Sequence, residues 1–295
     1  MMYDIGLYGL WYGNNYGSQI TYYALRYILQ SMGNSVLMIE NPLCGDTYVQ
    51  EHLDRSGPYQ FASRHNYAVS ELLPLNEMYK LNDQCRKFMI GSDQMWNFYL
   101  SRPYRQSYFL DFVDDDKVKV SYATSFGLMK YKGTEKDRVK TANNLEKFSA
   151  VSVRDGFSRE ILKYDFHISA KQVIDPVFLC DKEVYEELLV DLPDEYQGDF
   201  IFAYFLDPNR MVGNTLCEIA EKTGMKILFI PDLGAIPGEA AQKLGLHDDK
   251  IRVWERPTLE QWITCLVKSK YVLTDSYHGT IFSVIFRKPF LVKKI

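Results

Sequence analysis

The sequence is poor in the residues that build metal sites and disulfide frameworks. Its 295 residues contain only five cysteines, which are scattered, and no two of them form a Cys-x-x-Cys pair. A zinc site and a disulfide scaffold are therefore not indicated, and we expect reduced core cysteines. A basic excess is also missing, since the formal net charge is -4. This argues against a nucleic-acid partner bound through phosphate neutralisation.

Long apolar runs are missing as well. The N-terminal "MMYDIGLYGL" has neither the basic start nor the long apolar stretch of a signal peptide. No segment approaches the roughly 20 apolar residues that a membrane-spanning helix needs. We therefore expect a cytoplasmic protein without a transmembrane segment, either free or peripheral to the membrane.

Aromatic and aliphatic residues are abundant. The chain is 46% hydrophobic and contains 22 Tyr and 17 Phe, which indicates a folded globular protein of two domains at this length. Apolar runs of strand length alternate with stretches of helical period, the pattern of an α/β fold with a mainly parallel sheet. We predict strands near 3–10, 35–40, 86–91, 117–124, 150–154, 172–174, 199–206, 226–230, 251–254 and 271–275, and helices near 18–32, 134–147, 157–163, 209–223, 258–268 and 280–287.

An acidic stretch with proline and glycine signals separates two series of alternating elements. We predict an N-terminal Rossmann-like domain over 1–180, a linker over 181–198 and a C-terminal Rossmann-like domain over 199–295. Residues 41–85 are less periodic, and we interpret them as an insertion or a lid.

A glycine-rich turn follows the first strand. Gly9, Gly13 and Gly17 permit a tight turn before a helix that Ser18 can cap. Such a helix start can bind an anion or a hydroxyl group, but the glycines can also serve the turn alone. The spacing matches neither the dinucleotide fingerprint nor the P-loop, despite Glu40 at the end of the second strand.

Polar residues also follow the third strand, in "GSDQMWN" at 91–97. Its carboxylate (Asp93), amides (Gln94, Asn97) and indole (Trp96) suit a sugar, whose hydroxyl groups need donors and acceptors and whose apolar face stacks on a ring. The alternative is a helix start capped by Asp93 with Trp96 in the core.

Arg154 stands at the end of the strand "AVSVR". Its guanidinium could bind a carboxylate or phosphate of a ligand with two parallel hydrogen bonds. The alternative is an ion pair inside the domain, with Asp155 or Asp175.

A histidine follows the last predicted strand, in "TDSYHGTIFSVIF". Ser276 or Thr280 can cap the helix, and Gly279 allows close approach of the backbone. His278 then lies at the positive end of a buried helix, where it can exchange a proton or contact an anion. A structural histidine is the alternative.

Several stretches together resemble the polysaccharide pyruvyl transferase family: "GNNYGSQITYYAL", "IGSDQMWN", "SYATSFG", "SVRDGFS", "VIDPVFL" and "TDSYHGTIFSVIFRKPF". The resemblance implies two Rossmann-like domains facing a cleft, as in GT-B glycosyltransferases. It also implies transfer of pyruvate from phosphoenolpyruvate to a sugar of a cell-surface polysaccharide, or of its lipid-linked precursor, as a cyclic ketal. Phosphoenolpyruvate is then a co-substrate, and we expect no cofactor and no metal, because no cluster with ligand spacing is visible.

The resemblance also implies roles for Arg154 and His278, and the residue patterns above suggest the others. We assign catalysis to His278 and Asp93, and donor binding to Arg154, Ser276, Gly279 and Thr280. To acceptor binding we assign Asn14, Asn15, Gln19, Gln94, Trp96 and Asn97.

The chain departs from the family at two places. Relatives often carry Arg two residues before the histidine, where this chain has Ser276, and relatives continue beyond "KPF", so we expect an incomplete C-terminal domain. The alternatives are a GT-B glycosyltransferase that uses a nucleotide sugar and a glycan-binding family member without catalysis.

Overall fold

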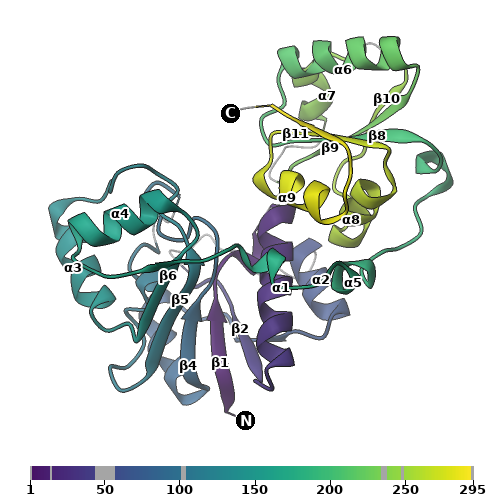
Figure 1. Cartoon of the computed structure of the whole chain (residues 1–295). Helices are drawn as coiled ribbons and strands as arrows, with labels where there is room; N and C mark the ends of the chain where they lie inside the picture. Colours follow the sequence, from purple (N-terminus) through teal and green to yellow (C-terminus); the bar gives the residue numbers. More distant parts are fainter. Residues whose placement is uncertain are drawn as a thin grey trace. The chain divides into compact units, whose positions relative to one another are not determined.

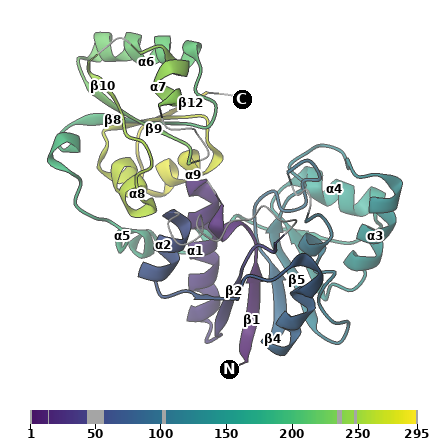
Figure 2. The same ribbon diagram turned by 180° about the vertical axis from the view of Figure 1, so that it is seen from behind.

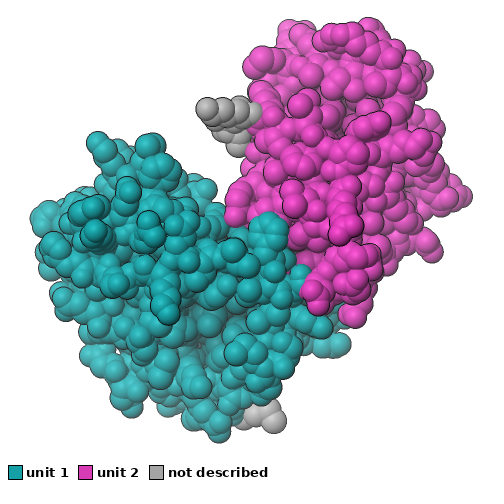
Figure 3. All heavy atoms as spheres, in the orientation of Figure 1, with its two compact units in different colours: residues 1–13, 18–180 teal, residues 14–17, 181–295 magenta. Residues whose placement is uncertain are grey.

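The structure is a computed structural model, and it describes residues 2–13, 15–43, 57–100, 104–233, 238–246 and 249–293. The chain divides into two compact units, coloured separately in Figure 3. Unit 1 comprises residues 1–13 and 18–180, and unit 2 comprises residues 14–17 and 181–295. Helix α1 (Tyr16–Ser31) therefore begins in unit 2 and continues in unit 1.

Unit 1 contains a parallel sheet of seven strands. The strand order is β3-β2-β1-β4-β5-β6-β7, in which the chain reverses its direction of winding between β1 and β4 (Figure 1). This is the order of a Rossmann sheet with one added strand. The strands are β1 (Tyr3–Tyr8), β2 (Val36–Ile39), β3 (Ala68–Val69), β4 (Cys85–Ile90), β5 (Val118–Thr124), β6 (Ala150–Val153) and β7 (Lys171–Gln172).

Both faces of this sheet are covered, because successive side chains of a strand point to opposite faces. Leu7 and Met38 join a cluster with residues of α1 and of α2 (Gly57–Arg64). Tyr8 and Ile39 join the other cluster, which includes residues of α3 (Glu135–Leu145) and α4 (Gly156–Asp165). Short 3-10 helices complete the unit: η1 (Leu10–Tyr12), η3 (Leu75–Asp83), η4 (Ser107–Phe109) and η5 (Pro176–Phe178).

Unit 2 repeats this plan with a parallel sheet of five strands. The order β10-β9-β8-β11-β12 has the same reversal, here between β8 and β11. The strands are β8 (Phe200–Phe205), β9 (Lys226–Pro231), β10 (Ile251–Val253), β11 (Tyr271–Thr274) and β12 (Phe290–Val292). The helices are α5 (Lys182–Glu186), η6 (Asp194–Tyr196), α6 (Arg210–Thr223), α7 (Glu239–Leu244), α8 (Leu259–Lys268) and α9 (Tyr277–Ile285).

The two faces of the second sheet are covered by different helices. Helices α6 and α7 contribute residues to the cluster on one face. On the other face, Trp262 of α8 packs against Phe202, Tyr204 and Phe282. Figures 1 and 2 show α8 and α9 side by side there.

The predicted α/β class and its main strands and helices are confirmed, and both sheets are parallel throughout the described residues. The short elements β3, β12, α2, α5 and α7 were not predicted. The segment 181–198 is part of unit 2, where Tyr185 is fully buried and packs edge-on against Phe282, so it is packed chain rather than a free linker. Within the described parts of the chain, no helix is long and apolar enough to cross a membrane.

Candidate functional site

The point where unit 1 reverses its winding is filled by a tyrosine. A Cβ at Gly9 would lie 1.5 Å from the Tyr22 hydroxyl oxygen, and a Cβ at Gly91 would lie 2.5 Å from the ring. The hydroxyl donates to the carbonyl of Ser92 at 3.0 Å. A dinucleotide phosphate would bind at such a reversal point. The Tyr22 side chain therefore explains two glycines without a ligand, in agreement with the mismatch to the dinucleotide fingerprint.

The other glycines of the first turn also accommodate this chain's own side chains. A Cβ at Gly13 would lie 2.8 Å from the hydroxyl oxygen of Ser18, and the Gln19 amide donates to the Gly13 carbonyl at 2.9 Å. Gln19 is also buried. Its amide therefore supports the turn, and an acceptor sugar would have to displace that bond. The predicted acceptor residue Asn14 lies outside the described residues.

Glu40 has a local role as well. The carboxylate of this buried residue accepts a bond from the Tyr59 hydroxyl at 2.5 Å and one from the Asn41 amide at 2.7 Å. Burial raises the pKa of Glu40. The side chain lines a cavity of about 930 Å³ together with Tyr59, Arg64 and Tyr67.

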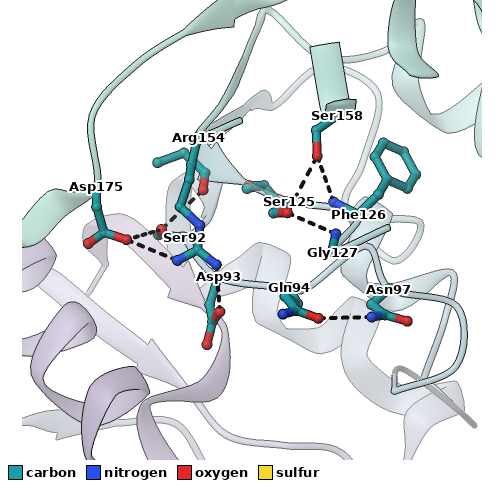
Figure 4. A network of polar contacts seen from close by, with 12 residues as sticks. Ser92, Asp93, Gln94, Asn97, Ser125, Phe126, Gly127, Arg154, Ser158 and Asp175 are labelled. Atoms are coloured by element: carbon teal, nitrogen blue, oxygen red, sulfur yellow. Dashed lines mark hydrogen bonds and ion pairs between the residues drawn. The ribbon is translucent and has the colours of Figure 1, made fainter. Parts of the chain in front are cut away.

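Three charged side chains meet at the carboxyl edge of the unit 1 sheet (Figure 4). Arg154 follows β6, and its two terminal nitrogens lie 3.0 Å from the carboxylate of Asp93 and 3.0 Å from that of Asp175. The Asp175 side chain is 0% exposed, Arg154 12% and Asp93 20%. The alternative of an internal ion pair is thus what the structure shows, with Asp175 as one partner.

Asp93 adopts a backbone conformation that few residues tolerate. Its φ is 81°, in the left-handed region, where Asp is tolerated better than most non-glycine residues. The Ser125 amide donates to its carbonyl at 2.8 Å, and Asp93 bridges Thr124 at the end of β5. The backbone thus aims the carboxylate at Arg154 instead of capping a helix with it.

The loop after β5 is fastened by serine hydroxyls (Figure 4). The Gly127 amide donates to the Ser125 hydroxyl at 2.8 Å, and the Phe126 amide donates to the Ser158 hydroxyl at 2.9 Å. Ser158 belongs to α4, whose N-terminus is capped by Asp155. The bond from Phe126 joins the loop after β5 to the first turn of α4.

Three predicted acceptor residues follow β4, and their side chains have partners within this chain. Trp96 is fully buried, its indole N–H donates to the Tyr108 carbonyl at 2.9 Å, and its ring stacks on Phe109. The Asn97 amide donates to Gln94 at 2.9 Å (Figure 4). This corrects the prediction of a sugar-stacking indole, because a ring inside the core has no face left for a sugar.

In unit 2, the predicted histidine lies within the first turn of α9. The helix begins at Tyr277, earlier than predicted, because the Ser276 hydroxyl accepts the Gly279 amide at 3.3 Å as its cap. His278 is 5% exposed. The Thr280 hydroxyl donates to the Ser276 carbonyl at 2.9 Å, and a Cβ at Gly279 would lie 2.7 Å from the Thr274 hydroxyl oxygen. The three predicted donor residues of this turn thus support the helix start.

A second polar cluster of unit 2 stands at the ends of β8 and β9. The carboxylate of Asp232 accepts a bond from the Tyr204 hydroxyl at 2.9 Å and one from the Asn15 amide at 3.2 Å. Burial raises the pKa of Asp232, and burial also raises the pKa of Tyr204. The predicted acceptor residue Asn15 therefore holds a carboxylate of its own chain.

Sequence reasoning missed Asp232, Tyr204 and Tyr22. Asp232 directly follows the apolar strand "KILFIP", so the rule that examines the residue after each strand applies to it. Tyr204 and Tyr22 gave no such signal, since each lies inside a regular element and reads as a core residue.

The described residues contain no group of three or more His, Cys, Asp or Glu side chains arranged to hold a metal ion.

A family model described as polysaccharide pyruvyl transferase matches residues 15–293. No curated protein sequence matches the chain at a significant level.

The chain is similar in structure to several solved proteins. S. aureus MnaA, in a co-structure with UDP, gives a TM-score of 0.60 at 14% identity, covering 100% of this chain and 80% of that chain. A putative UDP-N-acetylglucosamine 2-epimerase from Listeria monocytogenes gives 0.59 at 11% identity, covering 99% and 79%. A glycosyltransferase from Rickettsia africae gives 0.57 at 12% identity, covering 100% and 80%. At these identities the likeness shows the fold alone, which is GT-B-like with two Rossmann-like units.

Proposed function

The chain belongs to the polysaccharide pyruvyl transferase family, and on that premise we propose that this transferase moves pyruvate from phosphoenolpyruvate onto two hydroxyl groups of a saccharide. The observation that carries the proposal is the family match over residues 15–293, which spans all the candidate residues except Asn14. The acceptor is a sugar of a polysaccharide or of its lipid-linked precursor.

The proposed reaction needs one acid, one base and a site for the anionic donor. Protonation of phosphoenolpyruvate at C3 makes C2 an oxocarbenium-like centre, which one sugar hydroxyl attacks. Cleavage of the C2–O bond then releases inorganic phosphate, and the second hydroxyl closes the cyclic ketal. The two hydroxyl protons balance the reaction, since one equivalent appears on C3 and the other on phosphate.

In unit 1, the charged cluster supports a base and a donor contact. The three side chains carry one positive and two negative charges, so a bound anion would have to replace one carboxylate on Arg154. Asp93, at 20% exposed, is easier to displace than Asp175, at 0%. In the proposed mechanism the donor anion takes the place of Asp93 on the guanidinium, and the released carboxylate accepts a proton from a sugar hydroxyl.

In unit 2, the first turn of α9 supports the other roles. Helix N-termini attract anions through their amide groups and the helix dipole. His278 lies in that turn, where it would protonate C3 or contact the phosphate. Ser276, Gly279 and Thr280 would contribute mainly by shaping the turn.

The test is incubation of the protein with phosphoenolpyruvate and a panel of β-galactosides and N-acetylmannosamine-containing glycans. We expect release of inorganic phosphate together with a glycan product heavier by one pyruvyl ketal. His278→Asn serves as the inactive control. Phosphate release without a modified glycan would indicate hydrolysis and contradict the proposal.

The same panel with UDP-sugars tests the alternative of a nucleotide-sugar glycosyltransferase. The reason for including UDP-sugars is the similarity to MnaA, whose structure was solved with UDP. Glycosyl transfer from a UDP-sugar in the absence of phosphoenolpyruvate would overturn the proposed donor. Glycan binding without turnover by either donor would favour a family member without catalysis.

A further inference from the structure

Gly17 and His278 lie against each other within unit 2, although 261 positions separate them in the sequence. A Cβ built at Gly17 would lie 2.4 Å from Nδ1, 2.7 Å from Cγ and 2.8 Å from Cβ of His278. Real Cβ atoms do not approach other heavy atoms so closely. A hydrogen is therefore the largest group at position 17 that leaves the imidazole where it is.

The backbone of Gly17 gives no other reason for glycine. The residue lies in the first turn of α1 and is absent from the residues with positive φ. In a helix, glycine is less favourable than alanine by roughly 0.5–1 kcal/mol. The glycine at position 17 therefore costs helix stability, and the imidazole that it accommodates is the compensating feature.

The two residues before Gly17 are fixed on unit 2, so the helix start cannot easily move away from the imidazole. Tyr16 is fully buried, donates its hydroxyl to the Pro257 carbonyl at 2.8 Å and stacks on Trp262 with 5.5 Å between ring centroids. Asn15 donates to Asp232 at 3.2 Å. His278 itself is 5% exposed and has little room for another rotamer.

We propose that Gly17 is a positioning residue, which sets the orientation of the His278 imidazole through the fixed segment 15–17. Asn15 and Tyr16 hold this segment on unit 2. Gly17 leaves room for one placement of the ring. Residues 15–17 of the motif "GNNYGSQ" thus serve to position the histidine. The kinetic part of this inference rests on the proposed function, and its structural part does not.

The first test is a double-mutant cycle between Gly17→Ala and His278→Ala, followed by thermal unfolding. In the parent protein, Gly17→Ala should lower Tm by several degrees, because the methyl group forces the imidazole aside. In the His278→Ala background the loss of Tm should be clearly smaller, since the contacts with Nδ1 and Cγ disappear and only the one with the Cβ of residue 278, at 2.8 Å, remains. An equal loss of Tm in both backgrounds, or no loss in either, would overturn the proposal.

Gly57→Ala is the matched control. Gly57 is the first residue of α2, and no atom of the described residues lies within 4 Å of the position that a Cβ would take. This variant should be as stable as its background or slightly more stable, and by the same amount with His278 and with Ala at position 278.

The second test observes the imidazole directly, with protein labelled at its histidine side chains. The signal that disappears in His278→Asn identifies His278 in the NMR spectrum. Gly17→Ala should shift this signal while leaving those of His65 and His167 in place. An unshifted His278 signal in a folded Gly17→Ala protein would contradict the proposal, whatever the enzyme's donor is.

The third test is kinetic. If His278 is the acid, Gly17→Ala should lower kcat by about 10- to 100-fold, as expected for a catalytic group displaced by about 1 Å, with a smaller change in the KM for phosphoenolpyruvate. The limb of the pH–rate profile that disappears in His278→Asn should move in Gly17→Ala and stay in Gly57→Ala. The first two tests can succeed while the parent protein shows no turnover. That result would retain the positioning role of Gly17 and reject the proposed function. If the double-mutant cycle shows that Gly17 and His278 interact but Gly17→Ala keeps the kcat of the parent, the effect of Gly17 on catalysis would be rejected.

Discussion

The carboxylate of Asp175 is fully excluded from water and lies 3.0 Å from the guanidinium of Arg154. The amide of Val177 also donates to this carboxylate, at 3.2 Å, and the Ser92 hydroxyl lies 3.4 Å from it. A buried carboxylate depends on such partners, because its desolvation is costly. Arg154 is therefore a structural residue as well as a candidate donor contact.

Replacing Arg154 should destabilise unit 1. Arg154→Ala leaves the Asp175 carboxylate buried without its cation, and we expect the free energy of unfolding to fall by about 3–5 kcal/mol. The stability of Arg154→Lys should lie between those of the parent and Arg154→Ala. A lysine keeps a positive charge beside Asp175, but an ammonium group does not bridge two carboxylates as a guanidinium does. Chemical denaturation measures both changes.

Two variants control this prediction. Arg159→Ala, on the exposed side of α4, should stay within about 0.5 kcal/mol of the parent. Adding Asp175→Asn to Arg154→Ala should recover part of the loss, since the unpaired charge is gone. An Arg154→Ala protein as stable as the parent would show that the ion pair contributes nothing.

Asp93 allows its charge and its backbone to be tested separately. Asp93→Asn keeps a residue that tolerates positive φ and removes the carboxylate, so turnover should fall by roughly 10²–10⁴ if Asp93 is the base. Asp93→Ala and Asp93→Gly should lose turnover equally, but Ala should be less stable than Gly by about 1–2 kcal/mol because of the φ of 81°. Steady-state kinetics and denaturation measure the two effects. Full activity of Asp93→Asn would place the base elsewhere.

His278→Asn should affect both chemistry and stability. The structure buries the His278 ring against Gly17. We expect turnover per folded molecule to fall by roughly 10²–10⁴ and the free energy of unfolding to fall by about 1 kcal/mol. His167→Asn is the matched control, because His167 is exposed and has a φ of 58°, which Asn adopts readily. Equal effects of the two substitutions on turnover would exclude a catalytic His278.

Asp232 should give unit 2 a pH-dependent stability. Burial raises its pKa above the ordinary value of 3.8, so the folded state holds its proton more tightly than the unfolded state does. The resulting stabilisation is complete below that ordinary value and is lost as the pH rises through the raised pKa. Asp232→Asn cannot lose a proton, so its stability relative to the parent should increase over this pH range. Denaturation at a series of pH values measures the difference, and parallel curves for the two proteins would contradict it.

Examining the residues that follow each predicted strand identified some of the important residues but not their roles. Arg154 and His278 were found because polar residues that follow apolar strands stand out in a sequence. Trp96 and Asn97 were found by the same rule, yet the structure uses them in the core and in a local amide pair. A sequence shows that a residue follows a strand, but not whether its side chain meets solvent or another side chain.

The sequence by itself determined the α/β class, the main strands and helices, and the family. These follow from periodicity, from turn residues and from motifs, all of which are local along the chain. Only the tertiary structure decided the partners of the candidate residues: Asp93 and Asp175 for Arg154, Tyr22 for Gly9 and Gly91, and Gly17 for His278. The physical reason is that these contacts join residues far apart in the sequence, whose distances depend on how the strands are ordered in each sheet and on which side chains fill the space at their ends.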